Sequence, residues 1–152
     1  MIEMAQLPCK KILVVDDEPK TCRLLEEFLA QKGYEVFVAH QGDAAISRAQ
    51  AVHPDVILLD VLLAGGLDGV QTYHRLKGKS STRRIPVIFV TATAPGGSVT
   101  TQQLPLGEQC AVIGKPFQLD VLLQEIRRLL GEVGNTPAGT VPLTQNKTLP
   151  KR

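Results

Sequence analysis

The chain has 152 residues, of which 43% are hydrophobic, and a formal net charge of +2. This length corresponds to about one domain, and this apolar content supports a hydrophobic core and excludes a disordered chain. Acidic and basic residues are mixed along the chain, so charge alone gives no case for nucleic-acid or membrane binding. No apolar run is long enough to span a membrane, and the start MIEMAQLPCKK lacks the pattern of a signal peptide. We therefore expect a cytoplasmic protein.

Short apolar runs rich in Val and Ile recur along the chain, and we expect each to form a strand. The runs are mostly continuous rather than alternating, which indicates strands covered on both faces, as in a parallel sheet. They are Ile12–Val15, Val36–Ala39, Val56–Leu59, Val87–Val90 and Ala111–Ile113.

Helical patterns separate most of these runs. The first begins at Pro19, a favoured first-turn residue, and ends before Gly33, a favoured stop. Further helices are expected over about 43–51, 69–77 and 118–130. This alternation of strands and helices predicts a doubly wound α/β fold, a parallel sheet with helices on both faces.

The segment Thr91–Glu108 between the last two expected strands is a poor helix. It contains Pro95, Gly96, Gly97 and Pro105. Each interior Gly costs a helix about 1 kcal/mol and each interior Pro about 3 kcal/mol. The β-branched residues 99–101 add stiffness. We therefore expect the fourth helix to be short, with one or two turns at most, or to be a disordered, mobile loop.

The ends of the chain differ in composition from its middle. We expect residues 1–10 to be an amino-terminal extension, 11–130 to be the folded domain, and 131–152 to be a flexible tail or linker without apolar periodicity. Such a chain is either a stand-alone protein or a piece of a longer one. The 3 cysteines are expected to be free thiols. His40, His53 and His74 lack metal-ligand spacing, and we expect solvated or helix-end roles for them.

Polar side chains follow the expected strands at their carboxyl ends. Asp16 and Asp17 follow the first strand, Asp60 the third, Thr91 the fourth and Lys115 the fifth. In an open parallel sheet these ends share one edge, where ligands bind.

Carboxylates gathered at one edge need a compensating cation. Two of them about 4 Å apart repel by about 4 kcal/mol at an effective dielectric constant of about 20. A divalent cation or shifted pKa values must offset this repulsion, and Mg²⁺ prefers carboxylate oxygens and water. A Lys and a Thr hydroxyl beside the metal can bind an anion. Together these groups indicate a site for phosphoryl transfer.

Four segments of the chain resemble the receiver domain of two-component response regulators. They are KILVVDDEP from Lys11, Asp60 itself, RIPVIFVTA from Arg84 and KPF from Lys115. The resemblance covers about residues 11–130. It implies a flavodoxin-like sheet of five parallel strands in the order 2-1-3-4-5, and a phosphorylation-switched signalling module. Such a module is not an enzyme, because its only reactions are its own phosphorylation and dephosphorylation.

The resemblance also implies roles for the acidic residues. Asp60 corresponds to the phosphoacceptor. Asp17 and Asp60 correspond to direct Mg²⁺ ligands, with the backbone carbonyl of Leu62 as a third. Asp16 corresponds to the acid that holds a metal-bound water. The cofactor implied is therefore Mg²⁺.

The remaining roles concern the phosphoryl group and the partners. Thr91 corresponds to the hydroxyl that moves to meet the phosphoryl group, and Lys115 to its ammonium partner. Pro116 matches a cis-peptide position. The implied partners are a sensor histidine kinase or phosphotransfer protein and an unknown output partner, with no nucleic acid bound by this domain and no membrane. Whether the protein forms a homodimer stays open.

The sequence departs from the family pattern near the output region. Position 64 is Ala where Pro is usual, and one extra residue delays Gly69, so we expect a longer, softer loop after the acceptor. Val112 replaces an aromatic residue, and Gly114 a bulkier one. We therefore expect phosphorylation to be reported through another surface, or through order and disorder of residues 92–108.

Three alternatives to a phosphorylated receiver fit the sequence less well. A Mg²⁺-dependent phosphatase with an aspartate nucleophile usually has a second Asp two residues after the nucleophile, where this chain has Leu62. A receiver-like interaction module without phosphorylation would not need all these polar residues. A dinucleotide-binding domain is disfavoured because DDEP, not GxGxxG, follows the first strand.

Overall fold

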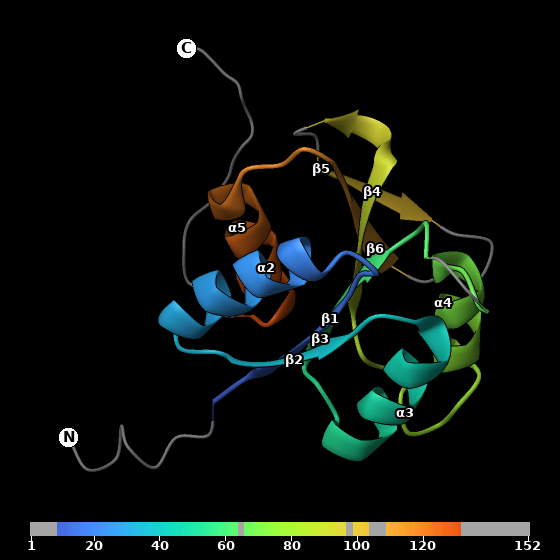
Figure 1. Ribbon diagram of the computed structural model, residues 1–152. Coiled ribbons are helices and arrows are strands. Elements are labelled where there is room, and N and C mark those ends of the chain that lie inside the picture. Colours follow the sequence, from blue (N-terminus) through green and yellow to red (C-terminus); the bar gives the residue numbers. More distant parts are fainter. Residues whose placement is uncertain (1–8, 64–65, 97–98, 104–108, 132–152) are drawn as a thin grey trace, which may run out of the picture.

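The computed structural model describes residues 9–63, 66–96, 99–103 and 109–131. In this part of the chain, one sheet is flanked by helices on both faces (Figure 1). Most of the expected amino-terminal extension and tail, residues 1–8 and 132–152, lie outside the described residues. The elements are β1 (Lys11–Val15), α2 (Pro19–Gln31), β2 (Glu35–Ala39), α3 (Gly42–Val52), β3 (Val56–Asp60), α4 (Gly69–Lys77), β4 (Val87–Gly96), β5 (Val99–Gln103), β6 (Gln109–Gly114) and α5 (Leu119–Leu129).

The sheet has the order β2-β1-β3-β4-β6-β5. The pairs β1–β2, β1–β3, β3–β4 and β4–β6 are all parallel. These strands are the five that the sequence predicts, and their order 2-1-3-4-5 is confirmed. The expected strand and helix bounds differ from the observed ones by a few residues at most, which is ordinary for element ends, except that β4 continues past Val90 to Gly96.

The region between β4 and β6 is extended where it is described. After the longer β4, β5 pairs antiparallel with β6, with Thr100 opposite Val112. The expected absence of a long helix here holds for the described residues, while positions 97–98 and 104–108 lie outside them. Val99–Gln103 forms β5, an additional strand that the sequence analysis does not predict. The β-branched residues that disfavour a helix also favour a strand, and β6 offers an edge to pair with.

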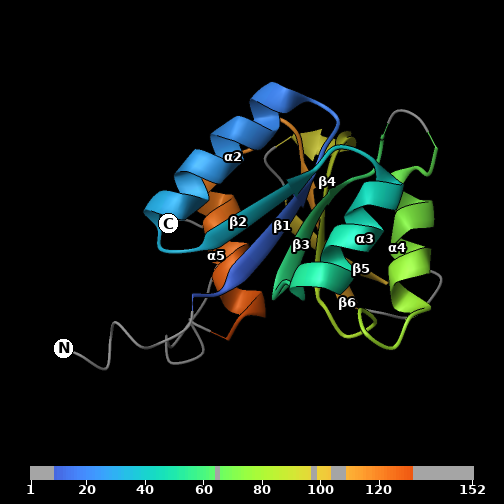
Figure 2. The ribbon, with the colours of Figure 1, turned by 60° about the horizontal axis from the view of Figure 1, so that its bottom comes forward.

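Two cores, one on each face of the sheet, follow from alternation along the strands. In β1, Ile12 and Val14 pack on one face while Leu13 and Val15 pack on the other, and all are at most 1% exposed. Figure 2 shows α2 and α5 on one face and α3 and α4 on the other. The first core adds Leu25, Leu29, Leu122 and Ile126, and the second Ala45, Ile46, Tyr73 and Leu76.

A capping box fixes the start of α4, which begins at the residue that the sequence predicts. The Asp68 side chain accepts from the Gln71 amide at 2.8 Å, and the Gln71 side chain accepts from the Asp68 amide at 3.0 Å. The two bonds satisfy backbone donors that a helix start leaves unpaired.

Gly69, the first residue of α4, contacts the end of β3. Its amide donates to the Val61 carbonyl at 2.9 Å. A Cβ at this position would lie 2.2 Å from the Asp60 carbonyl oxygen and 2.6 Å from the Val61 Cα. Only glycine permits this approach, so α4 rests directly on the backbone of Asp60. The extra loop residue does not separate the helix from the strand.

Gly69→Ala should therefore be costly. We expect it to lower the free energy of unfolding by about 1–3 kcal/mol, the usual cost of overpacking, because helix or strand must move. Urea unfolding followed by circular dichroism measures this change. Gly78→Ala is the control, since a Cβ there meets its nearest atom, the His74 carbonyl oxygen, at an ordinary 3.5 Å. Equal stabilities of the two variants would contradict the tight contact at Gly69.

Candidate functional site

A cluster of carboxylates lies at the carboxyl edge of the sheet. Oxygen atoms of Asp16, Asp17 and Asp60 all lie within 4.8 Å of one another. Asp60 ends β3, and Asp16 follows β1, whose last residue Val15 pairs with Leu59. Asp16 and Asp60 are only 4% and 7% exposed, while Asp17 is exposed. The sheet register thus brings together acids that are far apart in the sequence.

Lys115 places one positive charge against this cluster. Its Nζ lies 3.0 Å from Asp16 Oδ2 and 3.1 Å from Asp60 Oδ2. Its amide donates to the Thr91 carbonyl at 2.8 Å, and the bond to Pro116 is cis, as the resemblance implies. One ammonium group thus lies against two nearly buried carboxylates, those of Asp16 and Asp60.

The pKa values show how this charge is balanced. Burial raises the pKa of the Asp60 carboxyl group, although the Leu62 amide and Lys115 act in the opposite direction, and the charge of Asp16 raises it further. For Lys115, burial favours the neutral form, but hydrogen bonds and attraction from Asp16 and Asp60 outweigh it, so its pKa is raised. The lysine therefore stays charged, while the ionised form of Asp60 is held at a cost.

Thr91 and Leu62 flank this cluster. Thr91 follows Val90, the partner of Asp60 in the β3–β4 pairing, and is 2% exposed. The pairing of β4 with β6 shifts register after Thr91, and such irregularities are common beside functional sites. The Leu62 amide donates to Asp60 Oδ1 at 3.1 Å, so the backbone just after β3 turns back towards the Asp60 side chain. All the residues that the sequence singles out thus lie at or beside one edge.

A group of contacts that the sequence does not reveal holds the turn after β1. The Asp16 carbonyl oxygen accepts from Cys22 Sγ at 3.2 Å and lies 3.0 Å from His40 Nδ1. Because a carbonyl can only accept, this Nδ1 must carry a proton. The Glu18 amide donates to Asp16 Oδ1 at 2.9 Å. Burial is the main cause that raises the pKa of Cys22, to about 11, so its thiol stays protonated and can donate.

The three histidines lie in different surroundings. His40 is exposed, as expected for a solvated residue, but its ring also contacts the carbonyl of Asp16 in the turn after β1. His53 ends α3 in a left-handed conformation, with φ of 52°, so its expected helix-end role is confirmed. His74 is exposed on α4.

The arrangement has a defined chemical capacity. Asp16, Asp17 and Asp60 offer oxygen atoms close enough to share one cation, and oxygen ligands of this kind suit a hard cation such as Mg²⁺ better than a soft transition metal. The same Asp60 carboxylate can act as a nucleophile. Lys115 stands where it can neutralise an anion added to Asp60.

The fold and the acidic cluster define the class of the protein. The sequence matches the family model of the response regulator receiver domain over residues 12–127. The chain belongs to this family of regulatory domains of two-component signalling systems. None of the helices in the described part of the chain is long and apolar enough to cross a membrane.

Curated relatives differ in how much of their length this chain spans. The probable transcriptional regulator ycf27 of Cyanophora paradoxa is 39% identical over 131 residues, which are 86% of this chain and 52% of that protein. The response regulator PleD of Caulobacter vibrioides is 45% identical over 82 residues, or 54% of this chain and 18% of PleD. The polar-differentiation response regulator DivK of Brucella ovis is 31% identical over 123 residues, which are 81% of this chain and 98% of DivK.

Solved structures show the same fold. The receiver domain of a sensor histidine kinase from Pseudomonas aeruginosa PAO1 has a TM-score of 0.70 and 29% identity, over 82% of this chain and 99% of that one. That structure contains a magnesium ion coordinated in the active-site cleft. The chemotaxis protein CheY4 of Vibrio cholerae has a TM-score of 0.68 and 25% identity, over 81% of this chain and all 100% of CheY4.

Asp60→Asn should stabilise the metal-free protein at neutral pH. The pKa of Asp60 in the folded state is raised above its ordinary value of 3.8. The protonated carboxyl group therefore contributes stability below pH 3.8, and this contribution is lost as the pH rises through the folded-state pKa. We expect the variant to be more stable than the wild type at pH 7 by on the order of 1 kcal/mol, with the difference vanishing towards acid pH.

Urea unfolding without divalent cations, repeated across this pH range, measures the difference. Asp120→Asn makes the same chemical change at an exposed position in the first turn of α5, where the lost charge no longer interacts with the helix dipole, so this variant should be slightly less stable than the wild type rather than more stable. A wild type that is more stable than Asp60→Asn at pH 7 would show that the ion pair with Lys115 outweighs the burial of Asp60.

Proposed function

We propose that this chain is a phosphorylation-switched receiver that takes a phosphoryl group onto Asp60 from the phosphohistidine of a sensor histidine kinase or phosphotransfer protein. The observation that carries the proposal is the position of Lys115 Nζ, within 3.1 Å of carboxylate oxygens on both Asp16 and Asp60, beside a cluster suited to a cation. A structural ion pair needs one acid. Here one ammonium group contacts two nearly buried acids, and an oxygen of Asp17 is close enough to share a cation with them, which suits a reaction that involves both an anion and a metal.

The carboxylates are proposed to hold the metal. Asp17 and Asp60 would bind Mg²⁺ directly with the Leu62 carbonyl, and Asp16 would hold a water of the ion. The bound Mg²⁺ would neutralise charge on the phosphoryl oxygens. A relative of this fold, the histidine kinase receiver domain from Pseudomonas aeruginosa, has a magnesium ion in its cleft, which supports this choice of metal.

The proposed transfer is an in-line displacement. An Asp60 carboxylate oxygen attacks the phosphorus, and a P–O bond forms as the P–N bond to the histidine ring breaks, with the bonding pair left on the ring nitrogen. Lys115 pairs with the new phosphoryl group, and the Thr91 hydroxyl donates to it. Later attack by water breaks the P–O bond, releases inorganic phosphate and restores Asp60.

The phosphatase alternative has no support at the position that would distinguish it. A general acid is needed two residues after the nucleophile, and Leu62 has no titratable group and is 58% exposed. A module without phosphorylation is disfavoured because it gives no reason to bury two carboxylates against one lysine. We therefore propose no external substrate, and a signalling partner as the recipient of the switch.

Incubation with acetyl phosphate and Mg²⁺ tests the proposal. We expect intact-protein mass spectrometry to show one added phosphoryl group, labile to base as an acyl phosphate is, that is absent from Asp60→Asn. Asp120→Asn should label like the wild type. Labelling that persists in Asp60→Asn would place the acceptor elsewhere. Steady turnover of phosphoesters would favour the phosphatase, and the absence of both reactions would favour the module without phosphorylation.

A further inference from the structure

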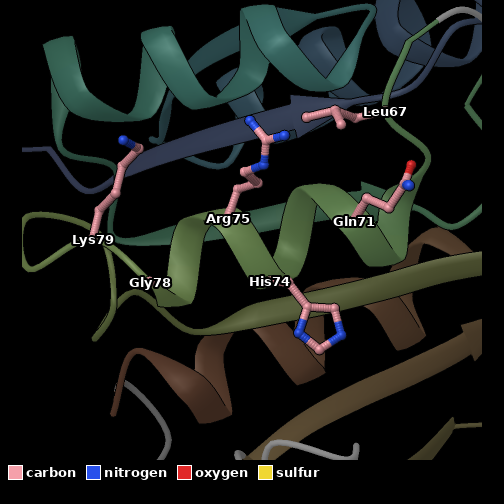
Figure 3. Close-up of a pocket in the computed structure, with 6 residues that line it drawn as sticks. All are labelled: Leu67, Gln71, His74, Arg75, Gly78 and Lys79. Carbon is pink, nitrogen blue, oxygen red and sulfur yellow. The ribbon is translucent and has the colours of Figure 1, made fainter.

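The outer side of α4 carries a hollow outside the acidic site. It has a volume of about 480 Å³ and is lined by Leu67, Gln71, His74, Arg75, Gly78 and Lys79 (Figure 3). Figure 3 shows Arg75 and Lys79 extending to the same side of α4, with Gln71 and Leu67 farther along that side, and His74 on the other side. We call this surface the α4 groove.

The surroundings of the α4 groove are strongly basic. No Asp or Glu occurs between Gly69 and Gly107, whereas RLKGKSSTRR, residues 75–84, is rich in Lys and Arg. Lys77 folds back, with its Nζ donating to the Arg83 and Ile85 carbonyls at 2.9 Å each. The other four, Arg75, Lys79, Arg83 and Arg84, are exposed. Within the described part of the chain none of those four forms a salt bridge.

The groove fits an acidic protein segment better than a nucleic acid. A duplex presents a charge about every 1.7 Å along its axis and needs a long basic track. Here the exposed Asp68 lies at the amino end of α4, and Asp43 lies near Gly66. These acids bound the basic patch at the end where Leu67 lines it. A short segment that combines carboxylates with an apolar side chain matches both the cations and Leu67.

The groove is joined to the acidic site through α4 itself. The helix begins at Gly69, which contacts the Asp60 carbonyl, and the Leu62 amide bonds to the Asp60 side chain. On its inner side, Tyr73 is 0% exposed and packs against Phe89 of β4, with ring centroids 5.3 Å apart. Because packed elements move as units, these contacts connect Asp60 to the helix that carries the groove.

We propose that the α4 groove, with Arg75 and Lys79 as its main contacts, binds an acidic segment of a partner protein and reports the state of Asp60. Binding of the acidic segment does not depend on the proposed phosphorylation, whereas the coupling of this binding to Asp60 does. The described residues between β4 and β6 include a strand, β5, in place of the usual helix. The α4 groove would then serve as the output surface.

Fluorescence anisotropy with a short labelled peptide of Glu and Leu tests the binding surface. A counterpart with Gln in place of Glu tests the role of charge. We expect Arg75→Glu/Lys79→Glu to weaken binding of the Glu peptide at least about tenfold, since two attractive contacts become repulsive. Lys10→Glu/Lys32→Glu changes the charge equally at exposed positions away from the groove and should retain affinity within about twofold.

Several results would overturn the binding surface. Equal losses in the two double variants would mean that only net charge matters. Equal binding of the Gln peptide would mean that charge is not recognised. Tighter binding of a short duplex DNA than of the Glu peptide, lost on Arg75→Glu/Lys79→Glu, would make this a nucleic-acid surface instead.

A second titration, with Mg²⁺ and beryllofluoride as a phosphoryl mimic, tests the coupling. We expect the affinity for the Glu peptide to change by about threefold or more in the wild type and not in Asp60→Asn. An unchanged affinity in a protein that does label at Asp60 with acetyl phosphate overturns the coupling. Failure to label at Asp60 is a separate outcome that overturns the proposed function and leaves the peptide-binding surface to be judged by its own variants.

Discussion

The ammonium group of Lys115 between Asp16 and Asp60 is the interaction on which the site depends. Both carboxylates are nearly buried, and each is within about 3 Å of the same Nζ. Removing water from charges is costly unless they are paired, and here two nearly buried carboxylates share one ammonium group. Burial raises the pKa of Asp60, so its ionised form is held at a cost that a bound metal cation would reduce.

Other elements of the fold contact Asp60 directly. The Leu62 amide bonds to its side chain, Gly69 approaches its carbonyl, and its pairing partner Val90 leads into Thr91. Gly69 thus joins α4 to Asp60, while β5 occupies the flank where a crossover helix is usual in the family. Val112, at the position that is usually aromatic, is 7% exposed and paired with Phe89 and Thr100. These features favour α4 over the β4–β6 region as the element that responds.

The strand ends were predictable because each acid or lysine follows a continuous apolar run, and parallel strands gather their carboxyl ends at one edge. Asp16, Asp60 and Lys115 could therefore be predicted together. β5 could not, because helix-breaking residues exclude a helix without indicating the pairing with β6. The contact of His40 with Asp16 was equally hidden, since it joins residues 24 positions apart and leaves no periodic pattern. The spacing of Gly69 is visible in the sequence, but its close approach to Asp60 is visible only in the structure.

The decisive test of the proposed metal site is the stability of the protein measured as a function of Mg²⁺ concentration. A cation that binds only the folded protein raises the free energy of unfolding by about 2.7 kcal/mol at a hundred times its dissociation constant. We expect such a rise at neutral pH in the wild type, and its loss in Asp17→Asn, which removes a proposed ligand. A wild type whose stability does not respond to Mg²⁺, or an Asp17→Asn variant that responds equally, would contradict it.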